Sequence, residues 1–205
     1  MKKFFYVLFF GALWGLTEAT LGYGLHFISV FIPGIAGFVM FAFAFLFMNM
    51  AYKKTKNLFT VIEVSMVAAS IKLLDLALPI HPIKAINPAI SILFEGLAVF
   101  TFLYLFKNKK SFTSIFTMSM SWRVAFVLLS FIEIPLNAPN FVISKNLIEI
   151  MNFLIIDSLI NSIIIYAFMK KIKLPEFKRI KNMKITPALS LVILSVAMLA
   201  ELNLR

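Results

Sequence analysis

The stretch Gly34–Ala51, GIAGFVMFAFAFLFMNMA, runs for 18 residues without a charged side chain. An α-helix crosses the hydrocarbon core of a bilayer with about 20 predominantly apolar residues. A helix that is apolar on every side has no face to turn toward water. The stretch also lacks the alternation of period 2 that is typical of strands in membrane barrels. It therefore predicts a membrane-spanning helix.

Six further stretches resemble this one in length and composition. The chain is 61% hydrophobic with a mean hydropathy of +0.96, which is more apolar surface than a soluble domain of 205 residues can bury. We predict an all-α fold: a polytopic membrane helix bundle with a six-helix core and a seventh, C-terminal transmembrane helix. The other stretches are Phe4–Phe27, Leu58–Pro79, Pro88–Phe106, Phe112–Leu136, Leu147–Met169 and Ile185–Leu204.

A basic linker separates the last stretch from the others. Residues 1–170 form the predicted six-helix substrate-binding core, 171–184 a basic cytoplasmic linker, and 185–205 the additional transmembrane helix. This helix is expected to begin at Thr186-Pro187 because Pro favours the first helical position. It carries only Glu201 near its far end, so we expect an appendage to the core.

The net charge of +11 comes from short basic clusters between the apolar stretches. That distribution sets membrane orientation and argues against nucleic-acid binding. It predicts a multi-pass protein of the cell membrane with a cytoplasmic N-terminus, and the absence of cysteine excludes disulfides and thiolate metal sites. Fifteen Lys and Arg residues then lie on the cytoplasmic side, in the segments Lys2–Lys3, Lys53–Lys56, Lys107–Lys110 and Lys170–Lys184.

Eight of the nine acidic residues lie within or at the ends of apolar stretches, as do Lys72 and Arg123. A charge in hydrocarbon costs roughly 2.5–3.5 kcal/mol even on the lenient insertion scale, so such residues normally face a cavity or a partner. Lys72 and Asp75 are i, i+3 neighbours and are expected to neutralise one another. Glu201 either lies at the membrane interface or joins a polar interior.

The remaining polar residues favour the outer half of the predicted bundle, as expected for a pocket open to the outside. Asn87 and Pro88 are expected to start a helix as its N-cap and first residue. Arg123 has two interpretations, a structural ion pair with Glu95 or Asp157 and a ligand contact. No metal or cofactor is predicted, since two histidines alone are a weak metal signal. The candidate substrate-binding residues are Glu95, Asp157, Arg123, Asn161, Asn152, Asn87, Ser91, Glu18 and His26.

Small residues form a stripe along the first predicted helix. Gly11, Gly15, Glu18 and Gly22 are spaced 4, 3 and 4 apart and fall on one face. Such a stripe allows another helix to approach closely. The neighbour is either a helix of the same chain or a separate protein, in which case Gly11, Gly15 and Ala19 form a docking face.

Two motifs resemble the substrate-binding S components of energy-coupling factor (ECF) vitamin transporters. The spacing Gly11-x-x-x-Gly15-x-x-x-Ala19 is similar to the Ala-x-x-x-Ala pattern of that family, and the segment NPAISILFEG, residues 87–96, resembles the outer entry to its fourth helix. The resemblance covers roughly residues 4–170. It implies capture of a vitamin or related micronutrient on the outside, and docking onto a membrane scaffold (T) component driven by two cytoplasmic ATPases.

The chain has no Gly-x-x-x-x-Gly-Lys-Ser/Thr phosphate loop and none of the hydrolase motifs Gly-x-Ser-x-Gly and His-Glu-x-x-His. We therefore expect a transport subunit rather than an enzyme. Two alternatives remain open at this point. One is an intramembrane enzyme acting on a lipid or peptide through acid–base chemistry of Glu18, Glu95 and Asp157. The other is a membrane scaffold or assembly protein whose glycine face binds a partner.

Overall fold

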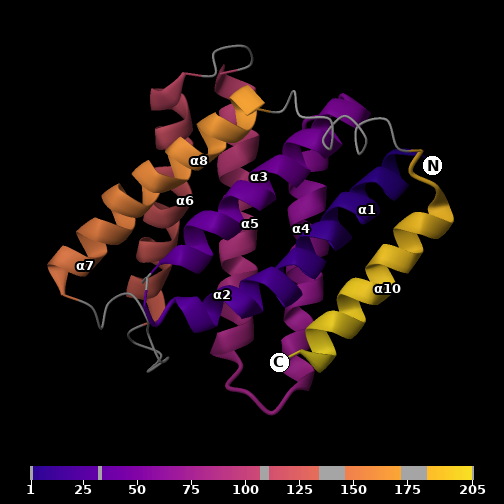
Figure 1. Cartoon of the computed structure of the whole chain (residues 1–205), viewed down its shortest axis with the longest axis horizontal. Helices are drawn as coiled ribbons and strands as arrows, with labels where there is room; N and C mark the ends of the chain where they lie inside the picture. Colours follow the sequence, from indigo (N-terminus) through magenta and orange to yellow (C-terminus); the bar gives the residue numbers. More distant parts are fainter. Residues whose placement is uncertain (1, 32–33, 107–110, 134–145, 172–183, 205) are drawn as a thin grey trace.

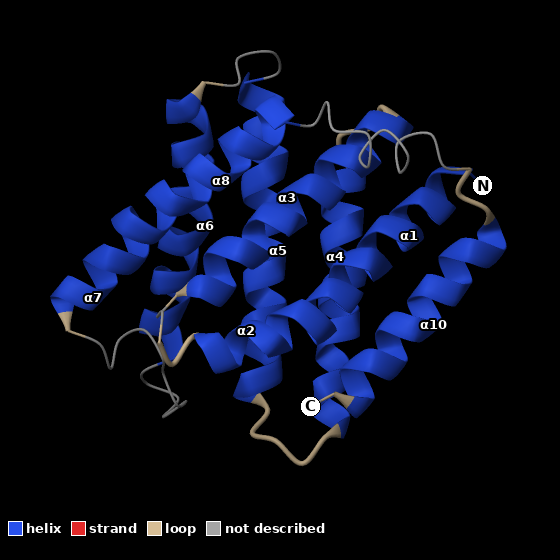
Figure 2. Ribbon diagram, viewed as in Figure 1, coloured by secondary structure: helices blue, strands red, loops and turns tan. Residues whose placement is uncertain are grey.

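The computed structural model describes residues 2–31, 34–106, 111–133, 146–171 and 184–204, and these residues form helices joined by loops (Figures 1 and 2). Residues 172–183, nearly all of the predicted linker, and the expected continuation of the fifth span beyond residue 133 lie outside the described residues. The helices are α1 (Lys2–Thr17), α2 (Tyr23–Ile28), α3 (Ile35–Thr55), α4 (Thr60–Lys72), α5 (Ile83–Phe106), α6 (Phe112–Glu133), α7 (Leu147–Met151), α8 (Asp157–Lys171) and α10 (Pro187–Asn203).

Three short segments continue these helices with a different hydrogen-bonding pitch. The π-helical turn η1 (Glu18–Gly22) joins α1 to α2, and a second π-helical turn, η4 (Asn152–Ile156), joins α7 to α8. The 3₁₀ segment η2 (Leu73–Ala77) extends α4. Leu78 then leaves the helical conformation, with φ −91° and ψ 155°, because the residue before a proline is pushed toward extended backbone.

Five of the described helical segments are long and apolar enough to cross a membrane, which supports the predicted bundle of membrane helices. They are Lys2–Ile28, Ile35–Thr55, Ile83–Phe106, Phe112–Phe131 and Leu147–Lys170. The expected third and seventh spans are shorter. In the third, the α-helix has 13 residues before the 3₁₀ segment begins, and α10 has 17 residues.

The start of α5 differs from the sequence prediction. We expected the helix to begin at Asn87-Pro88, but it begins at Ile83, and Pro88 lies inside it. The amides of Ala85 and Ile86 already donate hydrogen bonds to the carbonyl of Pro82. Proline removes its own amide donor and crowds the carbonyl four residues earlier, but α5 continues through Pro88.

The core lies where α1, α3, α4 and α5 meet, and its largest buried side chains include Trp14, Phe41 and Phe45. Helix α3 also contacts α8, and α6 lies between α5 and α8. Figure 1 shows α10, in yellow, running beside α1 at one edge of the bundle. The predicted start of α10 is confirmed: Thr186 caps it by accepting a hydrogen bond from the amide of Leu189, and Pro187 is its first residue.

The glycine stripe of α1 packs within the chain. A Cβ atom on Gly11 would lie 2.5 Å from Cβ of Val67, and one on Gly15 would lie 2.7 Å from Cδ1 of Ile71. Both neighbours belong to α4, and Ala19 is fully buried. The prediction that Gly11, Gly15 and Ala19 offer a free docking face is therefore corrected: small residues let α4 approach α1 closely, and that contact uses the face.

Helix α10 packs against the bundle through a buried face. The hydroxyl of Ser190 donates to the backbone carbonyl of Phe5, 3.0 Å away, and Ala197 and Glu201 are fully buried. Residues more than 180 positions apart in sequence are thus in direct contact, so α10 shares its buried face with α1.

Candidate binding cavity

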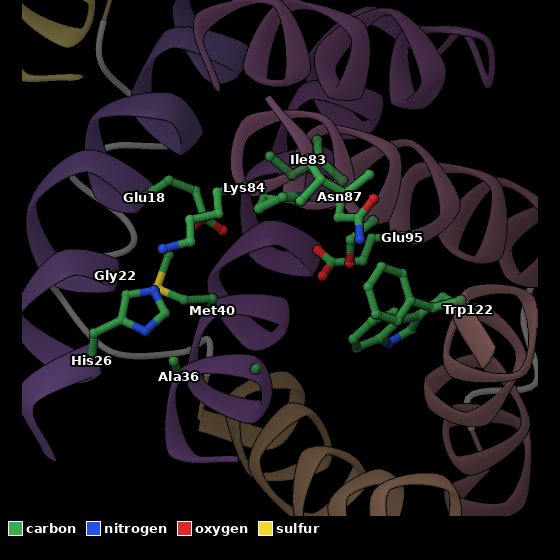
Figure 3. A pocket seen from close by; sticks show the side chains of 15 residues that line it. Glu18, Gly22, His26, Ala36, Met40, Ile83, Lys84, Asn87, Glu95 and Trp122 are labelled. Atoms are coloured by element: carbon green, nitrogen blue, oxygen red, sulfur yellow. The ribbon is translucent and has the colours of Figure 1, made fainter. Parts of the chain in front are cut away.

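A cavity of about 500 Å³ opens at the end of the bundle where α2 ends and α3 and α5 begin (Figure 3). Its walls come from η1, α2, the first turns of α3, the first half of α5 and the middle of α6. Most of the lining is apolar and includes Met40, Ile92 and Phe126. The polar and charged lining residues are Glu18, His26, Lys84, Asn87, Ser91, Glu95 and Trp122.

These groups lie at different depths. Glu95 and Asn87 are only 6% and 5% exposed, and Trp122 is also buried. Glu18 and Ser91 are half-buried, whereas His26 and Lys84 are exposed. The cavity therefore has a floor of buried polar groups and a mouth that carries a lysine and a histidine.

Three buried polar atoms of the lining have no hydrogen-bond partner among the described residues: Oε2 of Glu95, Oδ1 of Asn87 and Nε1 of Trp122. A buried polar atom without a partner costs about 1–3 kcal/mol, and such atoms are rare in folded proteins. All three belong to residues that line the same cavity. The cavity is thus the place from which a partner for them can come.

Local backbone features help to shape the floor and one wall. Pro88 lines the cavity within α5, and because it has no amide hydrogen, the carbonyl of Lys84 receives no helical hydrogen bond from position 88. In η1, a Cβ atom on Gly22 would lie 3.1 Å from Oε2 of Glu18. Glycine therefore gives the Glu18 carboxylate room, and π-helical turns of this kind are frequent at functional sites.

Arg123 supports the cavity from behind and does not line it. It is fully buried, and its guanidinium donates to the carbonyl of Ser119 at 2.8 Å and to Oδ1 of Asn161 at 2.5 Å. Asn161 in turn donates to the carbonyl of Phe38 at 2.5 Å. The guanidinium also lies over the ring of Trp122, 4.4 Å from its centroid. These contacts join α3, α6 and α8 and hold the indole in the cavity wall.

Electrostatic interactions extend across this region. The Glu95 carboxylate is near enough to Glu18 and Arg123 to interact with both charges. Arg123 interacts in the same way with Asp157 and Glu95. The direct hydrogen bonds of Arg123 go to Ser119 and Asn161, and its ion pair with Glu95 or Asp157 stays a prediction.

The structure brings together five of the nine predicted site residues. Glu18, His26, Asn87, Ser91 and Glu95 line the cavity.

The other four predicted residues lie outside the cavity lining. Arg123 and Asn161 form the buried network described above. Asp157 is half-buried and faces Gly34, where a Cβ atom would lie 2.9 Å from its Oδ2 atom. Asn152 is exposed on η4. The prediction that Asp157 belongs to the same binding site as Glu95 is thus corrected, because α8 directs it to the start of α3.

Sequence reasoning missed Met40, Lys84, Trp122 and Phe126 as lining residues. Trp122 and Phe126 are i, i+4 neighbours and therefore share one face of α6, a spacing that the sequence does display. Met40 lies in a uniformly apolar stretch that contains no signal of which face meets a cavity.

A second polar group, which we call the ionic cluster, consists of Lys72, Asp75 and Glu201. The ammonium of Lys72 lies 2.5 Å from Oδ2 of Asp75 and 2.7 Å from Oε1 of Glu201, and each side chain is at most 2% exposed. The predicted Lys72–Asp75 pair is confirmed. Glu201 is fully buried and joins α10 to the end of α4.

Among the described residues, no three His, Cys, Asp or Glu side chains gather in a way that could hold a metal ion. Comparisons with protein-family models, curated proteins and solved structures each found no match. The geometry and charge of the cavity are therefore the basis for a functional assignment.

Proposed function

We propose that this protein is the membrane-embedded substrate-binding subunit of an ATP-driven uptake transporter for a vitamin or related micronutrient. The observation that carries the proposal is the cavity whose buried lining groups, Glu95, Asn87 and Trp122, have polar atoms without partners among the described residues. Small-molecule sites are typically cavities of about 300–1,000 Å³, mainly apolar, with a few convergent polar groups. This cavity of about 500 Å³ has those properties.

The proposal assigns energy conversion to other proteins. The sequence has no phosphate-loop motif, so a bound substrate would be moved with the help of a membrane scaffold component and a pair of cytoplasmic ATPases, as the resemblance to ECF S components implies. Docking onto the scaffold would have to use a surface other than the Gly11–Gly15 face, because α4 covers that face.

In this proposal the protein spans the plasma membrane with its N-terminus in the cytoplasm and its cavity open to the outside. The ion pair of Lys3 with Glu63, 2.6 Å long, brings the starts of α1 and α4 together. The Ser190–Phe5 hydrogen bond brings the start of α10 to the same end. Lys2, Lys3, Lys56 and Lys184 lie at or just before these helix starts, at the end of the bundle opposite the cavity. With basic residues on the cytoplasmic side, as the positive-inside rule states, the cavity would face outward.

Two shorter helices complete the proposed set of seven spans. At about 1.5 Å per α-helical residue and 2.0 Å per 3₁₀ residue, α4 and η2 together are about 30 Å long, close to the thickness of the hydrocarbon core. Helix α10 is about 26 Å long by the same rule. Both are long enough to cross most of the core beside α1.

A pair of glycine variants tests the proposal. A Cβ atom on Gly37 or on Gly24 would meet nothing within 4 Å, but only Gly37 lines the cavity. We expect Gly37→Phe to fill the cavity and Gly24→Phe to leave it open, with both proteins folding normally. The measurement is mass spectrometry of small molecules released by denaturing each purified protein.

The wild type and Gly24→Phe should release the same compound, and Gly37→Phe should release little or none of it. Equal amounts from all three proteins would place the binding site elsewhere. Failure of the wild type to retain any small molecule through purification in mild detergent would contradict high-affinity capture.

A further inference from the structure

We infer that the cavity selects an organic cation: a flat ring that carries a protonated or otherwise positively charged nitrogen group, with that group at the floor. This inference rests on the proposed function as a small-molecule binder and adds the chemical class of the ligand.

The carboxylate of Glu95 lies at the floor of the cavity. Figure 3 shows it pointing into the space between Glu18 and Trp122. An ionised carboxylate only accepts hydrogen bonds, and burying one is costly unless it is paired. Glu95 forms no ion pair within the described residues, and its Oε2 atom has no hydrogen-bond partner there. A ligand that supplies a positive charge and N–H donors is its chemical complement.

Two cations lie near Glu95, and neither donates a hydrogen bond to it among the described residues. Arg123 directs its hydrogen bonds to Ser119 and Asn161, and Lys84 is exposed at the mouth. Two carboxylates, Glu18 and Glu95, face one ammonium among the charged lining residues. Among the charged lining residues, the carboxylate of Glu95 thus lies deeper than the ammonium of Lys84, an order that orients a cationic group inward.

Hydrogen-bond acceptors without partners also lie at the floor of the cavity. Oδ1 of Asn87 and Oε2 of Glu95 are both buried without a partner among the described residues. Both atoms accept hydrogen bonds, so a ligand that reaches them has to supply donors. An anionic ligand would meet acceptors and negative charge at the same place.

The two aromatic lining residues are the reason why we expect the ligand to contain a flat ring. Trp122 and Phe126 lie on one face of α6 and both line the cavity. Aromatic side chains favour offset-stacked or edge-to-face contact with another ring. Arg123 lies over the indole of Trp122 and helps to hold it in place. We expect the ligand's ring to pack against Trp122 and Phe126, with its positive group beside Glu95.

Three planar probes of nearly identical size separate charge from shape: benzamidinium (positive), benzamide (neutral) and benzoate (negative). The chain has two tryptophans, and Trp14 is fully buried in the core away from the cavity lining. In a Trp14→Phe background, Trp122 is the only tryptophan, so saturable changes in its fluorescence report on the cavity. We expect benzamidinium to bind at least about tenfold more tightly than benzamide, and benzoate to bind most weakly.

Charge removal at the floor provides the second half of the test. Glu95→Gln in the same background should weaken benzamidinium binding about tenfold or more and leave benzamide binding within about threefold. The matched control is Glu63→Gln, since Glu63 pairs with Lys3 away from the cavity lining and should leave both affinities unchanged. Thermal unfolding of each variant verifies that it is folded.

The inference is overturned if benzamide or benzoate binds as tightly as benzamidinium, if Glu95→Gln leaves benzamidinium binding intact, or if no probe changes the Trp122 signal. None of these outcomes touches the proposed function, which is judged by the compound that the wild type and the glycine variants release. A released compound that is anionic or neutral would leave binding in place and remove only the assignment of a cation.

Discussion

The ionic cluster and the cavity floor both bury carboxylates, yet they differ in what faces those carboxylates. Asp75 and Glu201 face the ammonium of Lys72 at 2.5 and 2.7 Å. Glu95 faces open space and has no ion pair within the described residues. A buried charge with a partner in the same chain is part of the architecture, and one that points into a cavity is a candidate for binding.

The difference also has a physical consequence for stability. Removing one member of a buried ion pair leaves an uncompensated charge, which costs far more than the pair itself contributes. Removing the charge of Glu95 breaks no ion pair among the described residues. The two regions should therefore respond in opposite ways to mutation: the ionic cluster through folding, the cavity floor through binding.

The largest effect is expected for Lys72→Met. This change leaves Asp75 and Glu201 buried without their cation and should lower the free energy of unfolding by about 3–5 kcal/mol. The measurement is thermal or denaturant unfolding in detergent. Lys84→Met is the matched control, because Lys84 is exposed and its loss should change stability by less than about 0.5 kcal/mol.

The same pair of variants also tests whether the ionic cluster and the cavity act independently. Folded Lys72→Met protein should bind benzamidinium with wild-type affinity, because the ionic cluster does not line the cavity. A stability loss below about 1 kcal/mol would show that the cluster contributes little to folding. A large loss of affinity in folded protein would show that the two regions act as one unit.

A smaller, graded effect is expected at three glycines of α1 and α2. Gly11→Ala puts a methyl group against Cβ of Val67 and the carbonyl of Val64, at 2.5 and 2.9 Å, and should destabilise the protein by about 1–3 kcal/mol. A Cβ atom on Gly15 lies nearest the flexible Cδ1 end of Ile71, at 2.7 Å, with Cγ2 and Cβ of Ile71 at 3.1 and 3.2 Å, so Gly15→Ala should cost less. Gly24→Ala meets nothing within 4 Å and should stabilise by up to about 1 kcal/mol through helix propensity.

Unfolding midpoints of the three alanine variants provide the measurement, and Val67→Ala should partly rescue Gly11→Ala. Equal midpoints for Gly11→Ala and Gly24→Ala would indicate that α4 does not press against α1. In that case the stripe would again be available to a separate protein.

The smallest effect on the protein itself is expected from single cysteines that report membrane sidedness. The chain contains no cysteine, so Lys54→Cys and Lys84→Cys each create one labelling site near opposite ends of the bundle, and neither should change stability by more than about 0.5 kcal/mol. A membrane-impermeant maleimide added to intact cells should label position 84 and not position 54. Labelling of position 54 alone would reverse the proposed orientation of the cavity.

Much of the helical framework could be predicted from the sequence because the bilayer imposes a simple rule. A spanning helix must be apolar over about 20 residues, and its ends are marked by polar caps and prolines. The starts at Leu147 and Pro187 follow this logic, with Asn146 and Thr186 as caps. The start of α5 does not, because Pro82 provides an earlier first turn and Pro88 is tolerated inside the helix.

The candidate site could be predicted only in part. Glu18, His26, Asn87, Ser91 and Glu95 line one cavity, and each was indicated by a polar side chain in or beside an apolar stretch. Asp157 has the same signature but faces Gly34. In a helix that is apolar on all sides, sequence gives the depth of a residue and not the rotation of the helix, so it cannot say which polar residues meet.

By itself, the sequence determined that the chain is a set of apolar helices, roughly where they begin and end, and that its charges within them need partners. Hydrophobic length and end caps are local properties, and a single chain displays them directly. Tertiary structure decided that Glu201 pairs with Lys72, 129 residues away, and that Gly11 packs against α4. It also decided that Glu95 faces a cavity. These outcomes depend on how helices rotate and pack against one another, which local sequence does not encode.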